Sequence, residues 1–160
     1  MSSGDETQIP GQLDPALLQR VADELEIRNV VARLAHFADT ATDEELQEYL
    51  TLFTDDATWM VVTDRFEPPP VRHGHAELLI GAQERRAANA QGPGSNCRHP
   101  VSTHSVVFET PDRARSRAYW QNITETTSPT QVGAGCGEYR DTFVRTPEGW
   151  KVERRELHPG

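Results

Sequence analysis

The fold is decided by residues 101–157, which read VSTHSVVFETPDRARSRAYWQNITETTSPTQVGAGCGEYRDTFVRTPEGWKVERREL. Four runs with strand character make up this stretch: Val101–Glu109, Arg113–Thr126, Val132–Arg145 and Trp150–Leu157. Short segments that each contain a proline separate the runs. Turns this short join neighbouring strands in antiparallel order. The stretch therefore predicts antiparallel strands that follow one another in a sheet.

Helical patterns precede the strands. Asp14 and Pro15 are typical of a helix start, and apolar residues recur at helical spacing from Leu18 to Ala38. The apolar face shifts near Glu26, which favours either one long helix or two shorter ones. A third helical pattern is expected over about residues 75–90.

A capping box, Thr42 with Glu45, predicts another helix start between these two patterns. Its apolar stripe includes Phe53, and Thr54–Asp56 is expected to end it. Residues 57–62 form a short β-rich run, and Phe66–Pro70 is expected to be a loop because three successive prolines cannot join a sheet.

Helices that come first and strands that come later indicate the α+β class, with helices packed on one face of a curled antiparallel sheet. Residues 1–13 are expected to be a disordered tail, and residues 14–160 a single domain. The chain length is consistent with one domain, because 160 residues bury a sufficient core without a disulfide or a metal.

Charge and cysteine content exclude several function classes. The net charge is −9, and 13 of the 25 acidic residues lie within residues 1–56, with no basic stripe of the kind that nucleic-acid binding requires. No apolar window is long enough to span a membrane, and the polar, acidic residues 1–12 are not expected to be a secretory signal. The only cysteines, Cys97 and Cys136, form no disulfide framework, so a cytoplasmic location is expected.

Several motifs, in their order and spacing, resemble one family. They are Phe37-Ala38-Asp39, the run Leu52–Trp59, Arg72-His73-Gly74, Arg98–Ser102, Tyr139-Arg140-Asp141 and Gly149–Arg155. The sequence resembles the SnoaL-like branch of the nuclear-transport-factor-two-like superfamily over about residues 17–157. That branch includes polyketide cyclases, scytalone dehydratase, bile-acid dehydratase, a dehydrochlorinase and small subunits of ring-hydroxylating dioxygenases. The resemblance implies a cone-shaped curved sheet wrapped over helices, with a pocket in its mouth.

The resemblance implies that Asp39 and His99 form a catalytic pair. Physical chemistry agrees with these residue types: a carboxylate at a helix C-terminus needs a partner, and an imidazole both takes and gives a proton near neutral pH. His104 is the alternative base. It lies five residues after His99, so on a regular strand only one of the two faces the pocket unless a bulge intervenes.

Further residues are expected to bind the substrate. Leu34 occupies a pocket position where dehydratases of this branch often carry a tyrosine, so the acid must come from elsewhere. Tyr49, Tyr119 and Tyr139 are the candidates, with Tyr139 preferred because it shares a strand face with Asp141. Trp59 and Trp120 are expected to be apolar walls.

Arg155 matches a pocket arginine of the dehydrochlorinase-like members. Strict strand alternation, however, puts Arg155 on one face with Glu153 and Leu157, opposite Trp150 and Val152, where a surface ion pair with Glu153 is the alternative.

Metal and cofactor binding are not expected. His73 and His75 could share a strand face, but a third ligand is lacking, and a strand end with a helix cap at Gly74 is the alternative. No nucleotide-binding motif is present. A homo-oligomer, a dimer or trimer, is expected to form through the outer sheet face that carries Val106 and Phe108 or their opposites.

The sequence thus favours a cofactor-free acid–base enzyme of the dehydratase, isomerase or cyclase type. Its substrate would be a small, largely apolar cyclic molecule that carries a carbonyl or hydroxyl. The alternative is a non-catalytic small subunit of a ring-hydroxylating oxygenase or a ligand-binding module. Epoxide hydrolysis is a third reading, for which a cluster of carboxylates is missing.

Overall fold

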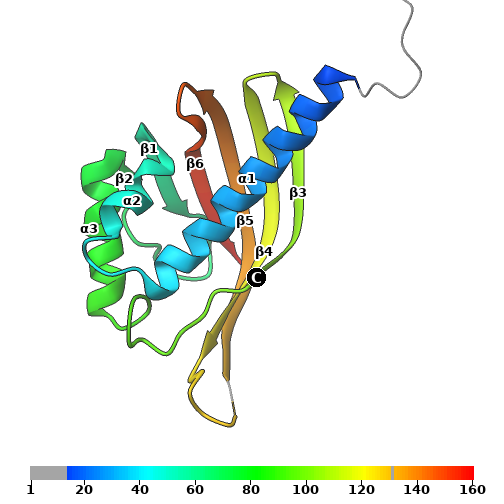
Figure 1. The fold of residues 1–160 in the computed structure, drawn as a ribbon. Helices are drawn as coiled ribbons and strands as arrows, with labels where there is room; N and C mark the ends of the chain where they lie inside the picture. The colour runs from blue at the N-terminus through cyan, green and yellow to red at the C-terminus, as the bar shows by residue number, and fades with distance from the viewer. Residues whose placement is uncertain (1–13, 131) are drawn as a thin grey trace, which may run out of the picture.

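The computed structural model describes residues 14–130 and 132–160, so the tail expected over residues 1–13 lies outside the described part. Within these described residues, three helices and six strands follow one another in the α+β order that the sequence predicts (Figure 1). The helices are α1 (Pro15–Thr40), α2 (Leu46–Thr51) and α3 (Gly74–Ala87). The strands are β1 (Phe53–Val61), β2 (Arg72–His73), β3 (Val101–Thr110), β4 (Arg113–Thr124), β5 (Val132–Thr146) and β6 (Gly149–Pro159).

The strands form a single sheet in the order β2-β1-β6-β5-β4-β3. The four long C-terminal strands pair antiparallel with their sequence neighbours, as predicted. The sheet is nevertheless mixed, because β1 pairs parallel to β6. Helix α1 crosses one face of this curved sheet, and α2 and α3 lie beside the β1–β2 end (Figure 1).

Helix α1 is continuous, so the possibility of two helices is wrong. Asp14 caps it by accepting a hydrogen bond from the Ala16 amide at 2.9 Å. Leu18 and Leu25, before the shift of the apolar face, are exposed, whereas Ile27 and Leu34, after it, are buried in the core. The shift near Glu26 marks where the helix begins to cover the sheet, not a break.

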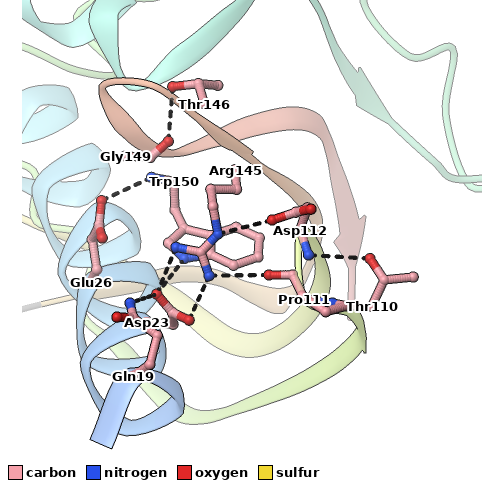
Figure 2. Close-up of polar contacts among 10 residues, drawn as sticks. All are labelled: Gln19, Asp23, Glu26, Thr110, Pro111, Asp112, Arg145, Thr146, Gly149 and Trp150. Carbon is pink, nitrogen blue, oxygen red and sulfur yellow. Dashed lines mark hydrogen bonds and ion pairs between the residues drawn. The ribbon is translucent and has the colours of Figure 1, made fainter. Parts of the chain in front are cut away.

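The buried carboxylate of Asp23 attaches α1 to β5 and β6 near the turn that joins these two strands (Figure 2). Asp23 accepts hydrogen bonds from the Arg145 guanidinium at 2.6 and 2.9 Å and from the Trp150 indole at 3.1 Å. Arg145 in turn stacks on Trp150 and donates to Asp112 in the β3–β4 turn. The contact therefore ties the helix to β5, to β6 and to the neighbouring hairpin at once.

Both expected bounds of the second helix are wrong: the helix begins at Leu46 instead of Thr42, and it ends at Thr51. The capping box exists, since the Thr42 amide donates to Glu45 at 2.7 Å, but the helix stops before Phe53 and residues 54–56 already belong to β1. The cause is tertiary: Phe53 is fully buried and pairs with Val152 of β6. Backbone pairing across the sheet outweighs the local helical pattern.

Val106 and Phe108 do not lie on the outer face of the sheet. Both pack against the buried core, while Val107 between them is exposed. Of the two faces considered for an oligomer contact, the outer one therefore carries Val107. No helix in the described residues is both long and apolar enough to cross a membrane.

Candidate active site

A cavity of about 510 Å³ lies between the helices and the inner face of the sheet. Side chains of α1, α2 and α3 form one wall, and residues of β1, β4, β5 and β6 form the other. Most of the surface is apolar. Of the residues that the sequence nominates, the structure brings Leu34, Trp59, His99, Trp120, Tyr139 and Arg155 into this wall. Asp39 and His104 are not among its lining residues.

Asp39 and His99 form a buried pair at the cavity wall, in which His99 is a lining residue and Asp39 is not. Asp39 lies in the last turn of α1, and His99 lies in the loop before β3. Oδ1 of Asp39 is 2.5 Å from Nδ1 of His99, and Oδ2 accepts a hydrogen bond from the His99 amide at 3.0 Å. Both carboxylate oxygens are therefore partnered, which offsets the unfavourable position of the charge at a helix C-terminus.

This contact sets the protonation pattern of the ring. Because a carboxylate accepts only, Nδ1 of His99 must carry the hydrogen. In the neutral ring, Nε2 is then the free base, and within the described residues nothing hydrogen-bonds to it. His99 lines the cavity, so the pair presents a base of fixed tautomer at the place where a ligand would lie.

Arg155 faces the cavity, and the expected alternation along its strand is wrong. The pairing of β5 with β6 shifts by one residue between Thr142 and Phe143, so that Arg155 lies on the buried side with Val152. Arg155 does not pair with Glu153. It donates to both oxygens of Asp141, at 2.8 and 2.7 Å, and both side chains are almost fully buried.

This pair keeps the guanidinium charged. Burial lowers the pKa of Arg155, but the charge and hydrogen bonds of Asp141 outweigh it and raise the pKa overall.

Tyr139 lies directly beside Arg155, whose guanidinium carbon is 4.4 Å from the centre of the Tyr139 ring. Burial raises the pKa of Tyr139 to about 12. The hydroxyl therefore stays protonated at neutral pH and can donate a hydrogen bond into the cavity. Of the other tyrosines considered, Tyr49 lines the same cavity, whereas Tyr119 is largely exposed and lies outside it.

His104 also turns toward the helix side of the sheet, because a bulge does intervene. Ser102 and Ser105 pair with Tyr119 and Arg117, so one extra residue is accommodated, and Thr103 adopts a φ of 51°. His104 does not line the cavity, and its Nε2 is buried without a hydrogen-bond partner in the described part of the chain. Burial, followed by the nearby Arg28 charge, lowers its pKa, so the ring is neutral.

The cavity also contains polar residues that the sequence did not nominate, chiefly Arg85 and Asn122. Arg85 sits in the last turn of α3, where a basic residue is ordinary. Asn122 is two residues after Trp120 on β4, so period-two alternation could have placed it on the same face. Trp120 itself lies against Gly137, where a Cβ atom would come within 2.7 Å of the indole.

The two histidines considered for a metal do not share a strand. His73 ends β2 and occupies the N-cap position of α3 without a side-chain capping hydrogen bond, and His75 lies within the helix. Gly74 between them has a φ of 68°. Across residues 14–130 and 132–160, no three side chains of the metal-binding types are grouped to hold an ion.

Comparison with known proteins agrees with this architecture. A family model described as SnoaL-like domain matches residues 19–156. Among curated proteins no match is found.

Solved structures share the fold. An NTF2-like protein with a cystatin-like fold from Novosphingobium aromaticivorans is 27% identical, with a TM-score of 0.73 over 93% of this chain and 92% of that one. A proposed scytalone dehydratase from the same organism is 19% identical, with a TM-score of 0.68 over 90% and 88%. The β subunit of a proposed aromatic-ring-hydroxylating dioxygenase, also from that organism, is 19% identical, with a TM-score of 0.66 over 89% and 91%.

Proposed function

Because the chain belongs to the SnoaL-like domain family, we propose that it is a cofactor-free acid–base enzyme, a lyase or isomerase, that acts on a small cyclic molecule. One observation carries the proposal: the His99 ring lies in the cavity wall with Nδ1 held by the buried Asp39. A histidine that served only packing would need neither the fixed tautomer nor access to the cavity.

The first chemical step is proton removal from a carbon next to a carbonyl group. Nε2 of His99 takes the proton, the C–H electron pair forms the enolate, and negative charge develops on the substrate oxygen. Asp39 stabilises the imidazolium that results. The same proton then returns at another carbon, or a neighbouring leaving group departs, which gives isomerisation or elimination.

The developing oxyanion needs hydrogen-bond donors, and two lie in the same wall. The Tyr139 hydroxyl is neutral and keeps its proton, and the Arg155 guanidinium is held in place by Asp141. Donors fixed by the fold stabilise a developing charge without reorganisation. Tyr139 is also the preferred acid for a leaving hydroxyl, since Leu34 supplies none.

A non-catalytic role is the second candidate, and the fold similarity to a dioxygenase β subunit supports it. In that role the cavity would result from the curvature of the sheet and have no function of its own, and neither Asp39 nor His99 would affect any reaction. A ligand-binding module would keep the cavity but not the proton transfer. The experiment below separates both from the enzyme.

Proton abstraction can be measured without knowing the product. The protein is incubated in D₂O with a panel of bicyclic ketones such as 1-tetralone and 1-indanone, and exchange of the carbon-bound proton is followed by NMR. We expect the wild-type protein and His36→Ala, which alters an exposed histidine one turn before Asp39, to accelerate exchange equally. His99→Ala should not accelerate it. Accelerated exchange that is equal in His99→Ala and the wild type would reject His99 as the base. Absence of acceleration by the wild type across the panel would favour the non-catalytic role.

A further inference from the structure

The charged side chains in the described cavity wall are all positive. Three arginines line the cavity, Arg85, Arg86 and Arg155, and the described lining contains no aspartate or glutamate. Two of the three are matched by carboxylates outside the lining: Arg155 by the buried Asp141, and Arg86 by the exposed Asp43 at 3.0 Å. These two arginines therefore add no net charge to the cavity.

Arg85 is different. The only hydrogen bond of its side chain to the described part of the protein runs from Nε to the Gln91 side-chain oxygen, at 3.0 Å, and Gln91 is neutral. Within residues 14–130 and 132–160, no carboxylate lies within 4 Å of its guanidinium. The adjacent Glu84 is engaged with Arg72 instead. The terminal nitrogens of Arg85, with four N–H donors, are thus left without a protein acceptor.

The guanidinium is held in a defined place although its charge is unmatched. Its carbon lies 4.7 Å from the centre of the Trp59 ring. Nη1 lies over Gly81, where a Cβ atom would come within 3.2 Å of it. Burial lowers the pKa of Arg85, which reflects the cost of desolvating this cation. A bound anion would offset that cost, since buried charges are normally paired.

A role for Arg85 in stabilising the end of α3 does not account for this arrangement. A basic side chain in the last turn interacts favourably with the helix dipole while it remains in water. Nothing in that role requires the side chain to line an apolar cavity, stack on Trp59 and lose part of its contact with solvent.

We propose that Arg85 is a specificity-determining residue that binds a carboxylate of the substrate, so that the substrate is a cyclic, apolar molecule with one carboxylate. The word substrate rests on the proposed function, but the binding site itself does not. One unmatched cation calls for one negative charge, and a planar guanidinium is suited to bidentate recognition of a carboxylate. The apolar wall accounts for the rest of the molecule, and 510 Å³ is ample for a bicyclic ring.

Binding of two probes of the same shape tests the proposal. 2-Naphthoate carries the carboxylate, and 2-naphthamide is its neutral counterpart; the dissociation constants of both are measured by calorimetry. We expect the wild-type protein to bind naphthoate about tenfold or more tightly than naphthamide, as a charge-assisted hydrogen bond to a partly desolvated cation implies. Arg85→Met should abolish this preference without changing naphthamide binding. Arg85→Lys, which retains the charge, should restore part of it.

Arg33→Met is the matched control. Arg33 also stacks on an aromatic ring, that of Phe37, but it pairs with Glu48 and lies outside the cavity lining. Its naphthoate preference should equal that of the wild type. Melting curves establish that each variant is folded. Equal wild-type affinity for the two probes, absence of naphthoate binding at millimolar concentration, or a preference that survives Arg85→Met would each overturn the proposal.

The binding experiment and the exchange experiment can each reject one proposal without rejecting the other. Carboxylate binding that depends on Arg85, together with no proton exchange, would retain this inference and reject the enzyme. Proton exchange that depends on His99, with no preference for naphthoate, would retain the enzyme and reject Arg85 as its anion site.

Discussion

Asp39 holds His99 at two points, with one carboxylate oxygen 2.5 Å from the ring nitrogen Nδ1 and the other accepting the His99 backbone amide at 3.0 Å. A single side chain thereby fixes both the tautomer of the ring and the position of the loop that carries it. The two residues are 60 positions apart in the sequence, so the pair exists only because the fold brings the last turn of α1 to the loop before β3.

Asp39 and His99 are expected to act as one unit. Replacement of either, as Asp39→Asn or His99→Ala, should lower the ketone exchange rate by roughly 10²–10⁴-fold, because the base or its orientation is lost. The double variant should be scarcely slower than the slower single variant. If the rate reduction of the double variant instead equals the product of the two single reductions, the two residues act independently.

His104 serves as the internal comparison for this pair. It is neutral and does not line the cavity, so His104→Ala should retain most of the exchange rate. A variant that is inactive yet melts like the wild type would assign the base to His104 instead of His99.

Tyr139 is expected to donate a hydrogen bond to the developing oxyanion. Tyr139→Phe removes only the hydroxyl and should slow exchange by about 10²-fold, a typical loss for one such donor. Because burial raises the Tyr139 pKa to about 12, the tyrosine does not ionise below pH 10. The wild-type exchange rate should therefore show no decline from this group between about pH 8 and pH 10. A decline there that Tyr139→Phe abolishes would contradict the assignment.

The Arg155–Asp141 pair is expected to dominate the stability of the inner sheet face. Asp141→Asn leaves a buried guanidinium without its counter-charge and should reduce the free energy of unfolding by about 3–5 kcal/mol. The double variant Asp141→Leu with Arg155→Met removes both charges and should be more stable than that single variant. Urea unfolding of the wild type, Asp141→Asn and the double variant measures the three free energies of unfolding. A double variant less stable than Asp141→Asn would refute the prediction.

Asp23 should make stability depend on pH in the acid range. Hydrogen bonds from Arg145, opposed by burial and aided by Trp150 and Gln19, lower the pKa of Asp23 from 3.8 to about 2. A lowered carboxyl pKa stabilises the fold above the unfolded value, and this contribution is lost as the pH falls from about 4 to about 2.

Asp23→Asn should therefore cost roughly 1–2 kcal/mol at neutral pH, a figure reduced for the partial exposure of Arg145, and much less near pH 2. Urea unfolding across this range provides the measurement. Glu48→Gln, in an exposed ion pair with Arg33, is the control and should change the free energy of unfolding by less than about 1 kcal/mol at any pH. A constant Asp23→Asn effect across the range would exclude this linkage.

Local patterns in the sequence were sufficient for most of the architecture. The helix cap at Asp14, the four C-terminal strands and their antiparallel order all follow from short-range spacing. The family motifs also indicate the Asp39–His99 pair, which the structure contains. The helix cap and the strand order depend on hydrogen bonds and turns between residues that are close in the chain, and the pair is indicated by the resemblance to the family.

Other features were decided by tertiary structure. Phe53 joined a strand because β6 pairs with it, and Arg155 turned inward because a shifted register in β6 changed its face. A single extra residue reverses every later side chain on a strand, and period-two reasoning has no means of locating it. The unmatched charge of Arg85 is likewise invisible in the sequence. Whether an arginine is paired depends on which carboxylates the fold brings within reach, and Glu84, its immediate neighbour, points to Arg72.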